Sequence, residues 1–109
     1  MKVCSFNLHG LNQGKTYLEE LCKTFDIVFV QEHWLAPFNL TDLNSISSSL
    51  TCYAVSAMAD VISHNILRGR PFGGLAVFIS NKLSSNVKVL FKSSRVLALQ
   101  INDVVLINV

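Results

Sequence analysis

The chain has 109 residues, of which 50% are hydrophobic and 15% are charged. This balance excludes a disordered chain and suffices for one hydrophobic core, so we expect a single domain or a part of one. The formal net charge of +2 conceals a basic segment, residues 61–102, which carries six basic residues and no acidic one. A phosphate-facing surface and an ordinary solvated surface both fit that segment.

Targeting signals and paired cysteines are missing from the sequence pattern. The longest apolar runs fall far short of the roughly 20 residues that span a bilayer, and the first residues lack the apolar region of a secretory signal peptide. We therefore expect an intracellular protein, in the nucleus or the cytoplasm, without a membrane partner. Cys4, Cys22 and Cys52 are odd in number and widely spaced. This pattern favours reduced core thiols over disulfides or a zinc site.

The first third of the chain has the pattern of a βαβ unit. Residues 3–8 predict a short strand, and the glycines and amides of residues 9–14 predict a turn. Apolar residues then recur at helical spacing, which predicts an amphipathic helix over residues 15–24. The apolar run of residues 27–30 predicts a second strand. Strands joined in this way are parallel.

The remaining segments predict mainly strands. Residues 37–50 are polar and serine-rich, which is typical of a surface loop with at most a helical turn at residues 41–46. A basic, glycine-rich connection covers residues 60–74. Short turns between several strand-like segments indicate an antiparallel meander. These segments are residues 52–57, 75–80, 87–91, 96–101 and 104–109. A single helix cannot cover such a sheet, so we expect an incomplete mixed α/β domain with one sheet face exposed.

Two polar residues stand at the ends of the predicted parallel strands. Asn7 lies near the end of the first strand, and Glu32 follows the second strand after Gln31. Ligand sites form at this edge of a parallel sheet. Amide and carboxylate oxygens suit a hard cation such as Mg²⁺. Asn7 and Glu32 are therefore candidate metal ligands, and the alternative is that Glu32 only caps an exposed strand end.

Neighbouring residues carry weaker indications of chemistry. His9 and His33 have side chains suited to acid–base catalysis, although hydrogen-bonded surface or loop histidines are the favoured interpretation. Trp34 could stack on a nucleic-acid base or simply pack beside the strand end. Gly73 and Gly74 fit either a close backbone approach to phosphate or a tight turn before a buried strand.

Four segments together resemble the endonuclease/exonuclease/phosphatase superfamily, whose fold is DNase I-like. They are residues 5–11 (SFNLHGL), 26–35 (DIVFVQEHWL), 73–77 (GGLAV) and 104–109 (VVLINV). The forms QEHWL and RGRPFGG are most similar to the reverse-transcriptase-associated endonucleases of non-LTR retrotransposons. The resemblance covers essentially the whole chain, but this chain corresponds to only about half of the family's domain. It implies a partial domain over residues 1–109, the N-terminal half of a four-layer α/β sandwich.

The resemblance also implies an activity and its cofactor. The parent reaction is hydrolysis of DNA phosphodiester bonds with Mg²⁺ or Mn²⁺, and Asn7 and Glu32 are catalytic residues of the metal site. The family's later motifs have no counterpart in these 109 residues. These motifs are the tyrosine and proline, the aspartate/asparagine pair and the terminal aspartate–histidine.

We therefore expect a truncated retroelement-type endonuclease domain that is inactive alone, poorly soluble, and complemented by the missing C-terminal half. Three alternatives stay open. The chain is a non-catalytic nucleic-acid-binding or interaction remnant, a phosphatase-type relative that acts on a small phosphoester, or an unstable gene fragment without activity.

Overall fold

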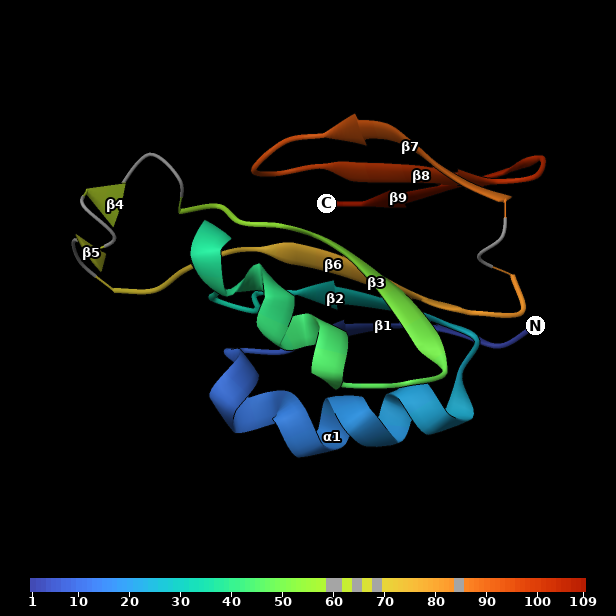
Figure 1. Cartoon of the computed structure of the whole chain (residues 1–109), viewed down its shortest axis with the longest axis horizontal. Helices are drawn as coiled ribbons and strands as arrows, with labels where there is room; N and C mark the ends of the chain where they lie inside the picture. The colour runs from blue at the N-terminus through green and yellow to red at the C-terminus, as the bar shows by residue number, and fades with distance from the viewer. Residues whose placement is uncertain (59–61, 64–65, 68–69, 84–85) are drawn as a thin grey trace.

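The structure, a computed structural model, describes residues 1–58, 62–63, 66–67, 70–83 and 86–109. Two helical segments and nine strands are assigned within these ranges (Figure 1). The helical segments are α1 (Leu11–Thr24) and the 3₁₀ helix η1 (Pro37–Ser45). The strands are β1 (Val3–Asn7), β2 (Ile27–Gln31), β3 (Leu50–Val55), β4 (Ile62–Ser63), β5 (Ile66–Leu67), β6 (Leu75–Ser80), β7 (Val87–Lys92), β8 (Leu97–Ile101) and β9 (Val104–Asn108).

The strands form two main sheets and one short pair. The first sheet has the order β1-β2-β6-β3, and its β1 and β2 are parallel, with Val3 opposite Ile27. The parallel pair predicted for the βαβ unit is thus confirmed. The second sheet has the order β7-β8-β9 and is antiparallel, and β4 pairs with β5. The predicted antiparallel meander is confirmed for β7 to β9 and for the antiparallel pair of β3 and β6, but β6 and β7 lie in different sheets.

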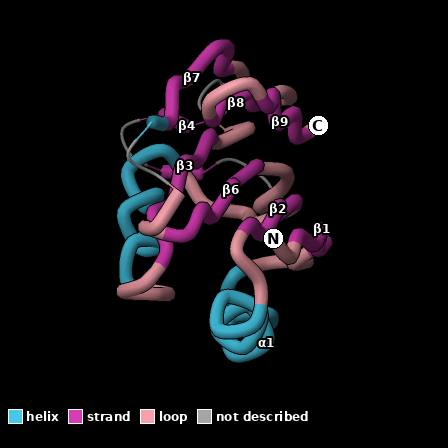
Figure 2. The backbone as a smooth tube through the Cα atoms, turned by 90° about the vertical axis from the view of Figure 1, so that its right-hand side faces the viewer, coloured by secondary structure: helices cyan, strands magenta, loops and turns pink. Residues whose placement is uncertain are grey.

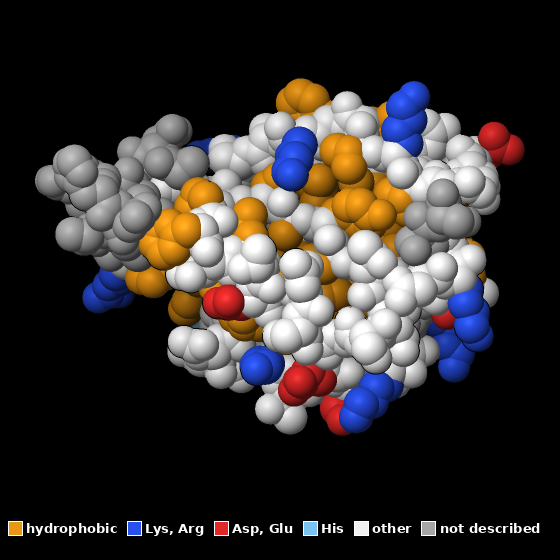
Figure 3. Space-filling view, viewed as in Figure 1, with side chains coloured by type: hydrophobic (Ala, Val, Ile, Leu, Met, Phe, Trp, Pro, Cys, Tyr) orange, Lys and Arg blue, Asp and Glu red, His pale blue; other side chains and the backbone are white. Residues whose placement is uncertain are grey.

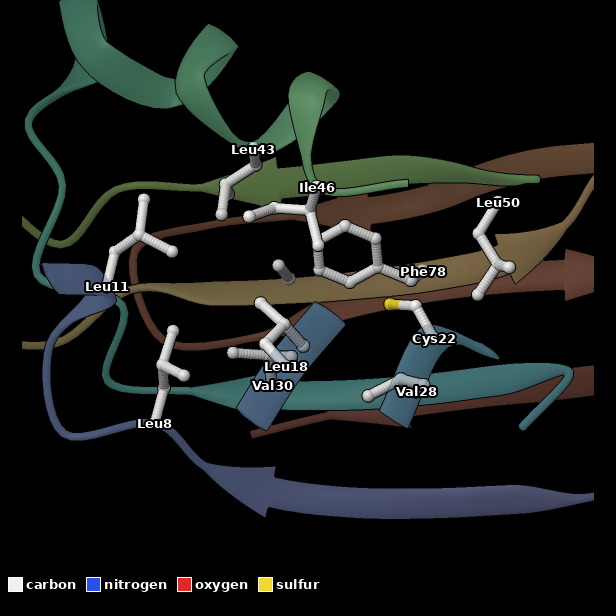
Figure 4. Close-up of a cluster of buried hydrophobic side chains, with 11 residues drawn as sticks. Leu8, Leu11, Leu18, Cys22, Val28, Val30, Leu43, Ile46, Leu50 and Phe78 are labelled. Atoms are coloured by element: carbon white, nitrogen blue, oxygen red, sulfur yellow. The ribbon is translucent and has the colours of Figure 1, made fainter. Parts of the chain in front are cut away.

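One face of the first sheet is covered by α1 and η1. The side chains of this layer form a buried cluster, most of which Figure 4 labels. Its members are Leu8, Leu11, Leu18, Cys22, Val28, Val30, Leu43, Ile46, Leu50, Ala76 and Phe78. The predicted surface loop over residues 37–50 is therefore wrong in part, since Leu43 and Ile46 fill the core beside α1. Their apolar side chains are buried, while the neighbouring polar residues are mostly exposed.

The opposite face of the first sheet packs on the second sheet. Ile27, Val77 and Ile79 of the first sheet join a second buried cluster with Leu97 and Leu99 of β8. Figure 2 shows the β7–β9 layer stacked on one side of the first sheet and α1 on the other. Both faces of the first sheet are thus covered, so this sheet does not have the exposed apolar face that the sequence predicted.

The exposed apolar face belongs to the second sheet. Phe91, Val105 and Ile107 are each at least half exposed, with relative exposures of 56%, 50% and 59%. Phe91 and Ile107 both pair with Ala98, so they lie in one row across β7-β8-β9. In the view of Figure 3, apolar side chains also gather where the second sheet meets the first.

Helix α1 begins four residues earlier than the sequence pattern indicates. Leu11 is buried, and Gly10 precedes it with a φ of 92° that a residue with a side chain rarely adopts. Gly14 was expected in a turn, yet it lies in the helix against Leu8. A Cβ at residue 14 would stand 2.3 Å from Leu8 Cδ1, so close packing explains this glycine.

The basic connection predicted over residues 60–74 is described only in part. Residues 59–61, 64–65 and 68–69 lie outside the described ranges. Among the described residues of this connection, β4 and β5 form the short strand pair, and Arg70 is exposed. No helix among the described residues is long and apolar enough to cross a membrane.

Candidate metal site

The structure brings Asn7 and Glu32 together. Asn7 ends β1 opposite Gln31 in the parallel register, and Glu32 follows directly. Both residues line one open pocket of about 550 Å³ at this edge of the first sheet. The rest of its lining comes from the ends of other strands and their loops. These residues are Gln31, Ala57, Phe72, Gly73, Gly74, Leu75, Ser94, Arg95 and Val109.

The backbone around Glu32 is held on both sides. Its carbonyl accepts a hydrogen bond from the Gly10 N–H at 2.8 Å, and its N–H donates to the Gly74 carbonyl at 2.8 Å. The residue has a φ of 60°, a left-handed conformation that is uncommon outside glycine. Strained residues of this kind cluster at functional sites because the surrounding structure fixes them.

The carboxylate of Glu32 has an unsatisfied oxygen. Glu32 Oε2 is buried and has no hydrogen-bond partner among the described residues. Leaving a buried carboxylate oxygen without a donor or cation is unfavourable, so this atom fits a bound cation. Asn7 lines the same pocket, and an amide oxygen together with a carboxylate is a donor set that suits Mg²⁺ or Mn²⁺. A metal role for Asn7 and Glu32 remains a prediction.

The described residues supply only some of the ligands that a bound cation needs. In the described part of the chain no group of three or more His, Cys, Asp or Glu side chains could hold a metal. Magnesium often uses one or two carboxylates and keeps several waters, so one glutamate with one amide is compatible with a weak hydrated site.

His33 is a hydrogen-bonded histidine in the loop after β2, as the sequence favoured, but it is buried in the core and does not lie at the surface. Its side chain has 0% relative exposure. Nε2 lies 2.8 Å from the Val55 carbonyl oxygen, and Nδ1 accepts a hydrogen bond from the Leu35 N–H at 2.9 Å. Burial lowers the pKa of His33, which favours the neutral ring. Its burial was not predicted, because a histidine after a strand gives no periodic signal of burial.

A polar network beneath the pocket was not identified from the sequence. Asn108 is buried in β9 and donates to the carbonyl oxygens of Val30 and Ala76 at 3.0 and 2.9 Å. Its side-chain oxygen accepts from Gln31 Nε2 at 2.8 Å, and Gln31 also donates to Ser5 Oγ at 3.0 Å. An asparagine inside an apolar strand was the available signal, because such a residue requires buried partners.

Arg95 and Ser94 were also not singled out as site residues. They lie in the β7–β8 turn and line the pocket with Glu32, and both are exposed. Their position depends on the stacking of the two sheets, which the sequence pattern does not indicate. The exposed Phe72 lines the same pocket. A guanidinium and a hydroxyl beside a carboxylate site are suited to a phosphate group.

His9 and Trp34 form a contact beside the site. Their ring centroids are 4.8 Å apart, and both residues have left-handed φ angles of 56° and 61°. His9 is exposed, whereas Trp34 is half-buried. A Cβ at Gly10 would lie 2.6 Å from Trp34 Cε3, so packing against the backbone determines where this tryptophan sits.

The cysteines are free and lie away from the pocket lining. Burial raises the pKa of Cys22 and Cys52 to about 12, and it also raises the pKa of Cys4. Thiols of this kind stay protonated and are poor nucleophiles. Their environment fits the core thiols expected from the sequence.

The fold and this strand-end site define a family. The profile of the Endonuclease/Exonuclease/phosphatase family matches residues 4–104, and the chain belongs to this family. Its strands and helices form the N-terminal portion of the family's DNase I-like α/β fold. No curated protein sequence matches the chain.

Solved structures agree with this assignment. One is the 3′ phosphatase NExo (D146N) from Neisseria bound to a product DNA hairpin, with a TM-score of 0.66 and 19% identity, covering 100% of this chain and 40% of that one. Another is the 3′-5′ exonuclease NExo from Neisseria meningitidis, with a TM-score of 0.64 and 21% identity, covering 100% and 41%. The chain thus spans about two fifths of the length of these structures.

Proposed function

We propose that this chain supplies the metal-binding portion of a DNA phosphodiesterase, with Glu32 and Asn7 as ligands of Mg²⁺ or Mn²⁺. The observation that carries the proposal is the buried, unpartnered Glu32 Oε2 in a pocket that Asn7 also lines. When bound, such a cation would act as a Lewis acid toward a phosphoryl oxygen. The two NExo structures, a 3′ phosphatase bound to a product DNA hairpin and a 3′-5′ exonuclease, support phosphoester chemistry on DNA.

The residues of the pocket can hold and orient a phosphate but cannot activate water by themselves. Among the described residues that line the pocket, Glu32 is the only one with a side-chain carboxylate, and none is a histidine. If Glu32 binds the cation, none of the lining residues that the structure describes remains as a general base. We therefore propose that the 109 residues alone have no appreciable nuclease activity.

A plasmid-nicking assay with Mg²⁺ and then Mn²⁺ tests this inactivity. We expect supercoiled plasmid to stay intact with the purified chain, because removal of a general base alone forfeits about 10²- to 10⁴-fold in rate. The control is Glu32→Ala, which separates the chain's own activity from that of a contaminating nuclease. Nicking by the chain that disappears in Glu32→Ala would overturn the proposed inactivity.

We further propose that the parent enzyme is of the retroelement endonuclease type. The support is the QEHWL form of residues 31–35, together with the RGRPFGG connection before β6. An intracellular location fits the proposal, since all three cysteines are free thiols.

A non-catalytic nucleic-acid-binding role is the second candidate, and the exposed Arg95 on the pocket favours it. Binding of this kind weakens steeply with salt because phosphate contacts release counterions. DNA binding that falls with salt and weakens in Arg95→Ala, without any need for Glu32, would favour this role.

The partner we propose besides DNA is the remaining, C-terminal part of a family domain. The chain aligns with about two fifths of the NExo chains, and the outer face of β7 to β9 is apolar and exposed. Co-expression with such a segment from a related domain should raise the yield of soluble chain, because it would cover that face.

A further inference from the structure

The imidazole of His33 lies where three strands of the first sheet end. His33 is two residues beyond β2, its Nε2 contacts the carbonyl of Val55 at the end of β3, and its ring lies against Gly74 just before β6. The side chain has no solvent exposure, so every polar atom on the ring needs a partner in the protein.

The two ring nitrogens have partners of opposite kind. The Val55 oxygen can only accept, so Nε2 carries the proton and donates to it at 2.8 Å. The Leu35 N–H can only donate, so Nδ1 is unprotonated and accepts from it at 2.9 Å. These partners together specify one state of the ring, the neutral Nε2–H tautomer.

The ring also requires glycine at residue 74. A Cβ at that position would lie 2.2 Å from His33 Cε1, closer than any real contact. Gly74 and the preceding Gly73 accept hydrogen bonds from the two residues on either side of His33. The Glu32 N–H donates to the Gly74 carbonyl at 2.8 Å, and the Trp34 N–H donates to the Gly73 carbonyl at 2.9 Å.

Glu32 and Trp34 flank His33, and both have left-handed backbones, with φ angles of 60° and 61°. Residues that are not glycine leave this conformation unless their surroundings hold them. The buried imidazole is the side chain between them that is hydrogen-bonded to both β3 and Leu35. Loss of these bonds would let the segment relax and change where the Glu32 carboxylate points.

We propose that His33 is a positioning residue, a neutral buried imidazole that ties together the ends of β2, β3 and β6 and thereby holds the Glu32 carboxylate in its pocket. The proposal rests on the proposed function in one respect, namely that the carboxylate binds a divalent cation. An apolar side chain of similar size could fill the same space, but it would leave the Val55 carbonyl and the Leu35 N–H without the hydrogen bonds that tie the strand ends together.

The first test is a spectroscopic signature in the 109-residue chain. Long-range ¹H–¹⁵N correlation spectra of the imidazoles should assign His33 to the Nε2–H tautomer, with Nδ1 unprotonated at neutral pH. His9 is exposed and serves as the internal reference. A His33 ring that is protonated on both nitrogens at neutral pH, or that is the Nδ1–H tautomer, would overturn the proposal. This measurement does not depend on the folding of any variant.

The second test is the affinity for Mn²⁺, measured by electron paramagnetic resonance of the free ion. His33→Leu should weaken Mn²⁺ binding by about 10- to 100-fold, as loss of an orienting partner does at other metal sites. Gly74→Ala should act in the same direction, because it displaces the ring without removing it. His33→Gln should recover part of the affinity, since its amide can still donate and accept.

A matched control separates positioning from loss of stability. Leu99→Ala removes a fully buried side chain from the cluster between the sheets and should leave Mn²⁺ affinity unchanged in the folded fraction. If His33→Leu stays folded and binds Mn²⁺ as the unmodified chain does while Glu32→Gln does not, the role of His33 is overturned. If Glu32→Gln also binds normally, the proposed function itself is overturned.

Discussion

Glu32 combines two unfavourable features at one residue, a left-handed backbone and a buried carboxylate oxygen without a described partner. Both features make sense if binding of a cation offsets them, since the strain and the desolvation are then part of the site. The same reasoning implies that the residue is optimised for function at the expense of stability.

Replacing Glu32 with glycine should therefore stabilise the folded chain. Glycine adopts a φ of 60° without steric penalty, and the left-handed conformation costs other residues about 1 kcal/mol or more. We expect Glu32→Gly to raise the free energy of unfolding by about 1 kcal/mol in a urea titration while abolishing the carboxylate site.

The matched control is Glu20→Gly at an exposed position inside α1. Glycine in a helix interior should lower the stability there by about 1 kcal/mol. A Glu32→Gly variant that is destabilised to the same degree as Glu20→Gly would contradict the idea of stored strain.

At the scale of the elements, the two sheets are joined by apolar packing and by one buried asparagine. Asn108 of β9 donates to the carbonyl groups of Val30 in β2 and Ala76 in β6, and it accepts a hydrogen bond from Gln31, which lines the pocket. The second sheet is thereby fixed against the ends of β2 and β6, and the Nδ2 group of Asn108 sits where a donor is required.

Asn108→Asp should be strongly destabilising although it changes few atoms. The new carboxylate would replace the amide that donates to two carbonyl oxygens at 3.0 and 2.9 Å. We expect a loss of roughly 2–4 kcal/mol in urea unfolding, because one oxygen of the buried carboxylate would face two carbonyl oxygens in place of a donor.

Asn44→Asp is the corresponding change at an exposed position of η1 and should alter stability by less than about 0.5 kcal/mol. Equal effects of the two substitutions would mean that Asn108 does not link the sheets.

The sequence predicted local elements better than their assembly. The βαβ unit and the strand over β6 follow from runs such as Ile27 to Val30, whose composition and period specify a buried strand. The parallel register of β1 and β2 also places Asn7 near Glu32, as expected. The stacking of a second sheet, the burial of His33 and the approach of Arg95 depend on contacts between distant segments. No local period encodes such contacts, so these features required the structure.

The whole molecule has a core on both sides of its first sheet but leaves the outer face of the second sheet open. Phe91, Val105 and Ile107 are exposed there, and β7 and β9 are edge strands of that sheet. Contiguous apolar surface and open strand edges promote self-association.

We expect the chain to bind a hydrophobic dye and to associate as its concentration rises, as judged by analytical ultracentrifugation. The double substitution Val105→Thr with Ile107→Thr keeps β-branched residues in β9 and should reduce both effects. Tyr17→Thr, at an exposed position of α1 on the opposite side of the molecule, should leave them unchanged. A chain that stays monomeric and binds no dye at any concentration would show that this face does not promote self-association.

The central claim is that Glu32 and Asn7 form a divalent-cation site, and Mn²⁺ titration followed by electron paramagnetic resonance tests it most directly. We expect saturable binding that Mg²⁺ displaces and that Glu32→Gln weakens by at least about tenfold, whereas Asp42→Asn, an exposed carboxylate on η1, changes nothing. Asn7→Ala should weaken binding less, since a neutral ligand contributes less than a carboxylate. Absence of saturable binding, or equal affinity in Glu32→Gln and Asp42→Asn, would contradict the claim.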